Sequence, residues 1–503
     1  MLDKQQQIRN SLIYLVPTLI GSLLPILMMP ILTRILTPED YGFLALANVY
    51  AVLVSGLSNV GLLRAYDREF FRYSDETSSA ELLYSILWLV LIALSATTLL
   101  TWGFRRALSS LILQSPDHGA LLTWVYCSTS VGSLKVYHMT YLKNSRMATH
   151  FAAYTLGGVL LATALSLLFV VVLRLGVLGI AWSSLGANLA VLAALSLRMR
   201  RRGRPTFNRR MLADALKLGY PLTPRVLFGV ISTQADKYLI GLLASTTDVG
   251  LYAKGQQISQ WVFTWMTSLQ NVFHPEVYRL MFDRPTEEGQ RAIGKYLTPF
   301  IYASIGAGLL VVALAEEAFH VLTPASYHGA IDLTMVLAMY YGSLFFGKIS
   351  GPQLVFVKKT YLVSLLTVGT IGLNAGISIP LILTYGALGA AWGTFLAGAI
   401  STAISLVVAQ RYYKIRWEWK QILAIFLTFY LAGIGLLWMR RSGTPYVIRV
   451  LTKATAMAVF AYIGVKIRVL TRENGRVLWG LARNVFSRSL WRNRGSNNRG
   501  EHD

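Results

Sequence analysis

Long runs of apolar residues recur along this 503-residue chain, and each run is long enough to cross a lipid bilayer as a helix. About 20 consecutive apolar residues are needed for a helix to do so. Within a bilayer the backbone N–H and C=O groups have no water to bond, and a helix pairs them inside one segment. The runs therefore predict an all-α polytopic membrane protein with about 14 transmembrane helices.

The composition agrees with this class. Only 14% of the residues are charged and 54% are hydrophobic, whereas a soluble protein carries roughly 25% charged residues. We place the predicted spans at 11–33, 43–63, 82–104, 119–142, 151–174, 177–197, 217–243, 250–273, 296–317, 330–351, 360–384, 387–410, 420–439 and 446–467.

A strongly basic segment divides the chain into two halves. Seven arginines lie among residues 198–210, and Gly203 and Pro205 make this stretch unfavourable as a helix interior. Basic loops between spans are typical of the cytoplasmic side. We expect five parts: an N-lobe of six spans (1–197), a basic cytoplasmic loop (198–216), a C-lobe of six spans (217–410), two further spans (411–469) and a basic cytoplasmic tail (470–503).

The basic residues alternate from one side of the predicted membrane to the other. If the N-terminus is inside, the cytoplasmic loops and the tail are basic, while the outer loops 244–249, 318–329 and 385–386 hold no Lys or Arg. An excess of Lys and Arg marks cytoplasmic loops, so both termini are expected in the cytoplasm. Topology and anionic lipid headgroups also account for the net charge of +24, so no nucleic-acid partner is expected. The exceptions on outer loops are Arg105, Arg106, Arg440 and Arg441.

The two halves repeat one another. Gly176-Val-Leu-Gly179-Ile-Ala-Trp182 matches Gly386-Ala-Leu-Gly389-Ala-Ala-Trp392 at an offset of 210, and the turns that end in Gly42 and Gly250 match loosely at 208. Each half holds an even number of spans, so the repeats share one orientation and form a parallel repeat. We therefore expect two six-helix lobes that face each other across a central cavity. The simpler role of these glycines is close helix packing.

Several ionisable residues lie within or beside the predicted spans. A charge at the bilayer centre costs roughly 3 kcal/mol or more, so it normally faces protein or water. Lys135, Arg225 and Lys348 lie deep, and we treat them as candidate residues of a cationic cavity. Such a cavity suits an anionic substrate. For residues near span ends, including Arg34, Arg64 and Lys254, the alternative is that their charged groups reach the membrane surface.

Asp236 in span seven is the acidic counterpart of these cations. It is our candidate for coupling transport to an ion, and its alternative role is to pair with a neighbouring cation. No cluster of His and Cys has metal-ligand spacing, and the near-P-loop at 342–350 has Ile349 where a Mg²⁺-binding hydroxyl belongs. We therefore expect no metal, no cofactor and no enzymatic activity.

A series of short motifs resembles the bacterial polysaccharide-transport family, which includes the O-antigen flippases. The motifs run in order over residues 10–415: Pro25-Ile-Leu-Met-Met-Pro-Ile-Leu-Thr-Arg34-Ile-Leu-Thr-Pro-Glu-Asp-Tyr-Gly42, Gly61-Leu-Leu-Arg64, Asp236-Lys-Tyr-Leu-Ile-Gly241, Gly250-Leu-Tyr252 and the two Gly-x-x-Gly-x-Ala-Trp segments. This family belongs to the multidrug, oligosaccharidyl-lipid and polysaccharide exporter superfamily. The resemblance implies two lobes that alternate in opening to either side, and a groove for a lipid tail formed by spans thirteen and fourteen. It also implies that Arg34 and Arg64, which lie in these motifs, are candidate residues of the cationic cavity together with Lys135, Arg225 and Lys348.

The resemblance also implies a function. Members of the family move undecaprenyl-pyrophosphate-linked oligosaccharide repeat units, of O-antigen or exopolysaccharide, from the inner to the outer leaflet of the bacterial inner membrane. The implied partners are that lipid-linked glycan and membrane lipids, with polysaccharide polymerase and chain-length proteins as candidate protein partners.

Two other functions are compatible with a polytopic chain of this kind. A multidrug antiporter of the same superfamily is expected to place acidic groups in its cavity, whereas the deep charges here are mostly positive. A glycan polymerase or ligase typically needs a large external loop, and no predicted outer loop clearly exceeds about twenty residues.

Overall fold

The computed structural model describes residue 17, residues 20–73, 76–200, 206–283 and 286–467, and residue 469. Helices make up almost all of this part, and it contains no strand, which confirms the predicted all-α class. The predictions that fall on the first sixteen residues, on 201–205 and on the tail from 470 lie outside the described residues.

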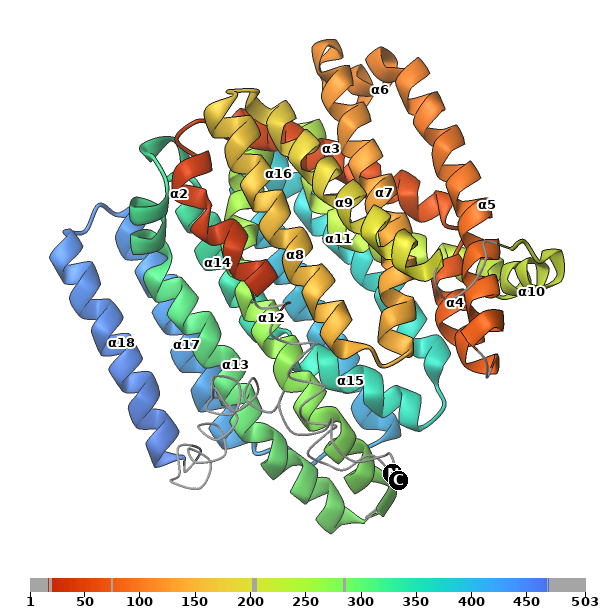
Figure 1. The fold of residues 1–503 in the computed structure, drawn as a ribbon. Coiled ribbons are helices and arrows are strands. Elements are labelled where there is room, and N and C mark those ends of the chain that lie inside the picture. The colour runs from red at the N-terminus through yellow and green to blue at the C-terminus, as the bar shows by residue number, and fades with distance from the viewer. Residues whose placement is uncertain are drawn as a thin grey trace, which may run out of the picture.

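The N-terminal half forms one lobe, coloured red to yellow in Figure 1. Its helices are α2 (Met29–Leu32), α3 (Pro38–Ser58), α4 (Leu62–Glu69), α5 (Glu76–Gly103), α6 (Arg105–Ile112), α7 (Gly119–Asn144), α8 (Ala148–Ser166) and α9 (Gly176–Arg200). Thr37 and Asp40 start α3 with a reciprocal capping box, which satisfies free N–H groups at the helix start.

The C-terminal half forms the second lobe, coloured green to cyan, with two more helices packed on it (Figure 1). The lobe contains α11 (Thr223–Leu243), α12 (Thr246–Asp283), α13 (Glu287–Leu322), α14 (Ala330–Ser343), α15 (Phe345–Phe356) and α16 (Thr360–Tyr412), followed by α17 (Trp419–Arg441) and α18 (Tyr446–Lys466). Both α17 and α18 pack on α13.

Ten helices of the described chain are long and apolar enough to cross a membrane. One of them, α16, covers two predicted spans, because it bends back at Gly386. The helices α7 and α12 lie where spans four and eight are predicted, and a shorter apolar helix at 20–32 lies within span one. The fold of two six-helix lobes plus two helices agrees with the prediction.

The Gly-x-x-Gly repeat has the same structural role in both lobes. Gly176 and Gly386 have φ of +59° and +56°, a left-handed conformation that favours glycine. Each residue starts the returning arm of a tight helical hairpin. Three residues later, a Cβ on Gly179 would press on Phe169, and one on Gly389 would overlap the carbonyl of Leu381. The repeat therefore encodes two close helical turns.

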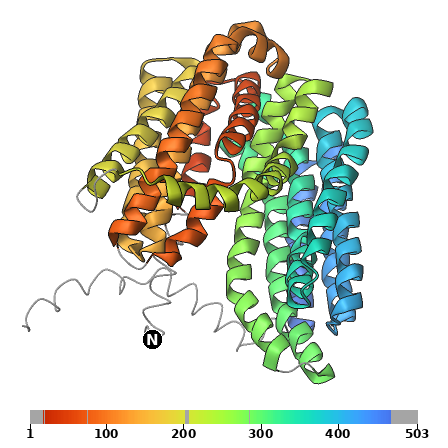
Figure 2. The same cartoon turned by 90° about the vertical axis from the view of Figure 1, so that its right-hand side faces the viewer.

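The segment between the lobes is partly helical, although the sequence predicted a loop over 198–216. The helix α9 continues to Arg200, and α10 covers Arg209–Gly219. The side chain of Asn208 caps α10 by accepting from the N–H groups of Arg210 and Met211. Leu212 and Ala215 are buried, and α10 packs on α4 and α5, crosswise to the long helices (Figure 2). An amphipathic surface helix thus replaces much of the predicted loop.

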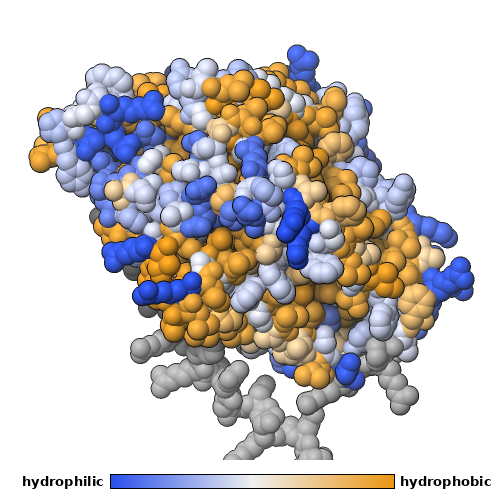
Figure 3. Space-filling model, turned by 90° about the horizontal axis from the view of Figure 1, so that it is seen from above, coloured by the Kyte–Doolittle hydropathy of each residue, from blue (hydrophilic) through white to orange (hydrophobic). Residues whose placement is uncertain are grey.

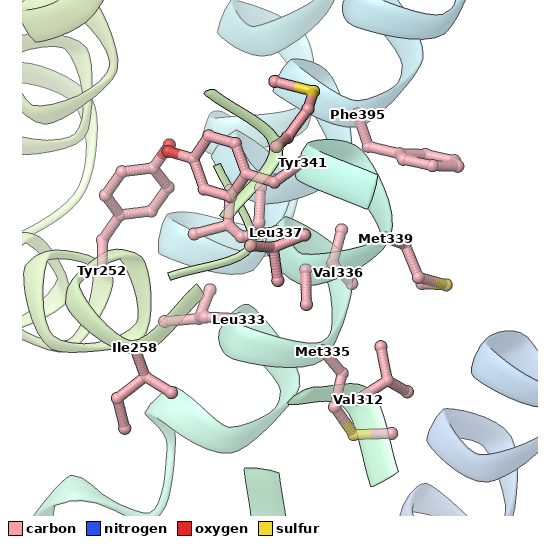
Figure 4. Close-up of a cluster of buried hydrophobic side chains, with 14 of the residues drawn as sticks. Tyr252, Ile258, Val312, Leu333, Met335, Val336, Leu337, Met339, Tyr341 and Phe395 are labelled. Carbon is pink, nitrogen blue, oxygen red and sulfur yellow. The ribbon is translucent and has the colours of Figure 1, made fainter. Parts of the chain in front are cut away.

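The core of the C-lobe lies around α14. Every side chain from Leu333 to Met339 on this helix is buried. Figure 4 shows Leu333 beside Ile258 of α12 and Met335 beside Val312 of α13, with Tyr252 and Tyr341 pointing toward each other. Because lipid is itself apolar, this dense packing, rather than a hydrophobic effect, holds such helices together.

Candidate functional site

The two lobes meet at one end of the bundle, which we call the outer end because the predicted topology places it outside. It comprises the loops 33–37, 113–118, 244–245, 323–329 and 385–386. Hydrogen bonds join the lobes there: Gln114 Nε2 donates to the Gly241 carbonyl at 2.7 Å, and Tyr327 Oη donates to the Leu36 carbonyl at 2.6 Å. Figure 3 looks down on this end, where hydrophilic patches alternate with apolar surface.

One close contact between the lobes is symmetric. A Cβ on Gly42 of α3 would overlap the carbonyl oxygen of Thr246, and a Cβ on Gly250 of α12 would overlap that of Pro38. Each glycine thus contacts the residue four positions before the other glycine. This is the contact expected where an axis relates two parallel repeats. The loose sequence match between the two turns therefore marks the point at which the lobes cross.

A buried lysine lies beside this crossing. Lys254 of α12 is only 7% exposed, and its Nζ lies 3.2 Å from the ring centre of Tyr41, which belongs to the other lobe. The ring of Tyr41 also packs edge-on against Tyr327. The position near a span end suggested that Lys254 reaches the membrane surface, but its charge lies between the lobes. A cation over an aromatic face in a desolvated place is stabilised by about 2 kcal/mol.

Asp236, the candidate coupling residue, is buried within the C-lobe. Its carboxylate accepts hydrogen bonds from Tyr252 Oη at 2.9 Å, Thr394 Oγ1 at 3.0 Å and Asn374 Nδ2 at 3.2 Å. Ser378 in turn donates to Asn374 Oδ1 at 2.6 Å. The alternative role, a pair with a neighbouring cation, is absent from the described ion pairs. The carboxylate, which lies on α11, is instead held by neutral groups from α12 and from both arms of α16.

Lys135 belongs to a polar network inside the N-lobe. Its Nζ donates to Asn188 Oδ1 at 2.6 Å, which joins α7 to α9. The amide of Asn188 also donates to the Ser128 carbonyl at 3.2 Å. Lys135 is half-buried and has no carboxylate partner among the described ion pairs. Within the described residues, its charge is therefore met by the side-chain carbonyl of Asn188 and by no carboxylate.

Lys348 has a comparable place in the C-lobe. It lies on α15, half-buried, with its Nζ 4.9 Å from the ring centre of Phe263 on α12. It too lacks a carboxylate partner in the part of the chain that the structure describes. Lys135 and Lys348 thus provide one unpaired cation in the fourth span of each lobe.

The other three candidates are exposed and lie on separate elements. Arg34 lies in the turn after α2, Arg64 lies in α4, and Arg225 lies in the first turn of α11. No described hydrogen bond or ion pair joins any two of the five predicted cations. Their gathering around one cavity therefore stays a prediction.

A hollow of about 420 Å³ opens at the outer end, but its lining differs from a cationic cavity. It lies between the lobes, where α3 begins, and its walls carry two carboxylates and an imidazole: Glu39, Asp40, Phe43, Leu113, Gln114, Ser115, His118 and Thr246. None of the five predicted cations lines it.

A buried ionic cluster explains two charges near the end of the chain. Arg449 and Lys453 lie in span fourteen, beside the lipid groove that the family resemblance implies, where an unpaired charge would be costly. Both pair with Glu316 of α13, at 3.0 and 2.8 Å, and Lys453 also reaches Glu317 at 2.7 Å. Similarly, Arg440 and Arg441, two exceptions to the charge rule, both pair with Asp332. These four cations therefore serve to hold α17 and α18 on the C-lobe.

Comparison with known proteins agrees with this architecture. A family model described as "polysaccharide biosynthesis protein" matches residues 31–332, more than half of the chain. The chain belongs to the polysaccharide biosynthesis protein family. Over 194 residues it is 22% identical to the probable low-salt glycan biosynthesis flippase Agl15 of Haloferax volcanii. That match covers 39% of the chain and 41% of the relative, so it spans about two fifths of the relative's length.

Solved structures share the fold of this polysaccharide biosynthesis protein. The lipid II flippase MurJ in an inward closed conformation matches with a TM-score of 0.66 at 16% identity, over 91% of this chain and 99% of that one. A multidrug resistance MATE family transporter of the MOP superfamily, in an inward-facing conformation, matches with a TM-score of 0.58 at 14% identity. This match covers 83% of this chain and 95% of that one. These neighbours are transporters or flippases rather than enzymes.

Sequence reasoning missed several residues of this family member's interior. Tyr252 belongs to the Gly250-Leu-Tyr252 motif, and Asn374 is a polar residue on an otherwise apolar helix face, which is a signal in itself. Ser378 and Thr394 carry no separate signal, because such residues are common in membrane helices. Lys254 was visible, and only its environment was misjudged. Within the described residues, no group of three or more His, Cys, Asp or Glu side chains is placed to hold a metal ion.

Proposed function

We propose that this protein is a flippase that moves undecaprenyl-pyrophosphate-linked oligosaccharide repeat units from the inner to the outer leaflet of the bacterial inner membrane. Both termini lie in the cytoplasm in this proposal. The observation that carries it is the family match over residues 31–332, on a chain whose fold is that of MurJ. The similarity to a glycan biosynthesis flippase supports the same substrate class.

The distribution of charge supports an anionic cargo. Lys135 and Lys348 have no acidic partner among the described ion pairs. The buried acids of the described chain all have partners: Glu69 and Glu316 pair with two cations each, and Asp236 accepts from three neutral donors. Unpaired cations attract phosphate groups. A multidrug antiporter, the alternative, needs a free acidic group for an organic cation.

The arrangement of the linker supports rocking of the lobes as the mechanism. The described part of the linker is fastened to the N-lobe: the Asn208 N–H donates to Ser85 Oγ at 2.8 Å, and Gly219 packs against Gly61 so closely that neither could carry a Cβ. The chain then passes through a short 3-10 turn at Tyr220–Leu222 before α11 starts. We therefore place the pivot at 220–222, at the edge of the predicted loop rather than within it.

A cross-link tests this pivot. In a Cys127→Ser background, Ser85→Cys with Asn208→Cys would fix α10 to the N-lobe. If the pivot lies at 220–222, the oxidised protein keeps its transport activity, as measured by glycan export. Loss of export on oxidation and recovery on reduction would mean that α10 itself must leave the N-lobe.

We also propose that Asp236 couples transport to a proton or sodium gradient. A buried carboxylate bonded to a carboxamide and two hydroxyl groups offers the oxygen ligands that hard cations prefer, and a carboxylate can equally carry a proton. Asp236→Asn keeps the shape and removes the charge. Gradient-driven transport by this variant in vesicles should fall at least tenfold, whereas unchanged dependence on Na⁺ and pH would exclude Asp236 from coupling.

The membrane potential is a second driving force under this proposal. Moving about two negative charges outward releases roughly 4–5 kcal/mol per 100 mV, at about 2.3 kcal/mol per charge. Dissipating the potential at fixed pH and Na⁺ should therefore slow transport. An unchanged rate would eliminate this contribution.

Mass spectrometry of lipid-linked sugars tests the function itself. Cells with and without the protein are labelled from outside, so that lipid-linked sugars of the inner leaflet remain unlabelled. Accumulation of an unlabelled undecaprenyl-pyrophosphate repeat unit in the deletion strain would support the flippase and identify its cargo. No accumulation, together with increased sensitivity to cationic dyes, would favour the multidrug antiporter.

A further inference from the structure

The outer rim of the N-lobe carries an arginine pair beside two exposed aromatic side chains. At the junction of α5 and α6, Trp102 and Phe104 are 59% and 62% exposed. Arg105 and Arg106 follow directly, and the guanidinium of Arg105 lies 5.6 Å from the Trp102 ring centre. A hollow of about 410 Å³ is formed by this junction alone, and it is lined by Trp102, Gly103, Phe104, Arg105, Arg106 and Ala107.

These arginines lack the partners that the other outer pair has. Arg440 and Arg441 both pair with Asp332. Arg105 and Arg106 are exposed, and neither pairs with an acid among the described ion pairs. They also run against the charge bias, since outer loops are normally poor in arginine. The pair therefore has no evident structural use in the chain itself.

The surroundings place the pair at the level of lipid headgroups. The helix α5 has 28 residues, about 42 Å at 1.5 Å per residue, more than the roughly 30 Å of the hydrocarbon core. Trp102 lies in its last turn, and aromatic side chains of this kind gather at the membrane–water boundary. Leu99, Leu100 and Leu111 are also exposed around the junction. A pair of guanidinium groups directly above these aromatic and leucine side chains lies at the level of the lipid phosphate groups.

The hollow is separate from the region where the lobes meet. The helix α6 packs on α7 and on the turn at 116–118, both in the N-lobe, and it lies at the edge of the molecule opposite α18 (Figure 1). A lipid already in the bilayer reaches this position from the side, without passing between the lobes. Arginine binds phosphate through two parallel hydrogen bonds and remains charged at any physiological pH.

We propose that Arg105 and Arg106 bind the headgroup phosphate of an anionic phospholipid in the outer leaflet, with Trp102 and Phe104 beside its glycerol and upper chains. The start of α6 adds to the attraction, because its N-cap residue Phe104 supplies no side-chain cap and no acidic residue lies in its first turn. The bound lipid fixes the outer end of α5 and α6 in the membrane.

Native mass spectrometry tests this site. The purified full-length protein is titrated with phosphatidylglycerol and with phosphatidylcholine of the same chain length. We expect wild type to retain phosphatidylglycerol preferentially, and Arg105→Gln with Arg106→Gln to weaken its binding roughly 30-fold, which is about 2 kcal/mol for two charges. The double variant Arg105→Lys with Arg106→Lys, which keeps both positive charges, should lose much less of its phosphatidylglycerol binding.

The matched control is Arg174→Gln, another exposed outer arginine that lies in the turn between α8 and α9. It should leave phosphatidylglycerol binding unchanged. The proposal is overturned if wild type does not distinguish the two lipids, or if Arg174→Gln weakens binding as much as the double variant does. A thermal unfolding curve for each variant shows that the chain is still folded. The result is independent of whether the protein moves lipid-linked glycans.

Discussion

At the scale of single residues, the charged side chains within the spans differ in whether they have an ion-pair partner. Glu316 is 5% exposed and holds both Arg449 and Lys453. Removing one partner of a buried ionic cluster costs about 3–5 kcal/mol, because the remaining charges are left uncompensated. Glu316→Gln should therefore lower the unfolding temperature in detergent markedly, and Glu317→Gln, whose side chain is 30% exposed, should lower it less. Equal effects would contradict this role for Glu316.

At the scale of an element, the returning hairpin of α16 depends on backbone contact. Gly389 lies against the Leu381 carbonyl and Gly393 against Ser378. A methyl group at Gly389 meets backbone, which cannot move aside as a flexible side chain can, so Gly389→Ala should destabilise the protein by several kcal/mol. Gly372→Ala, on the same helix with open space around it, should be neutral or slightly stabilising. Thermal unfolding of the two variants compares them. Similar unfolding temperatures for the two variants would mean that the hairpin backbone can move to accommodate a methyl group at Gly389.

At the scale of the whole molecule, the closed outer end depends on the crossing of Gly42 and Gly250. A larger side chain at Gly42 would push α3 away from Thr246 and favour a state in which this end is open. In a Cys127→Ser background, a cysteine at Gln257, one turn from Lys254, reports this change. Gly42→Leu should raise its labelling by an impermeant thiol reagent several-fold, and Gly103→Leu, in open space, should not. Unchanged labelling would show that the crossing is not the barrier.

The fold class and the internal repeat could be predicted from the amino-acid sequence alone. Recurrent runs of about 20 apolar residues predict membrane helices. Gly176 and Gly386 recur because each hairpin needs the same backbone conformation. The motifs also indicated the family, and Asp236 was identified as an unusual buried acid. Such signals are local, since each depends on neighbouring residues in the chain.

The partner of each charged side chain, by contrast, follows from the packing of the helices and could not be predicted from the sequence. Lys254 and Tyr41 are distant in sequence, as are Glu316 and Lys453, and no periodicity reports that they meet. The same holds for Asp236, whose donors come from α12 and α16. A lone charge in a span predicts that some partner exists, because an unpaired charge is too costly in lipid. Which residue that partner is depends on how helices far apart in the chain pack.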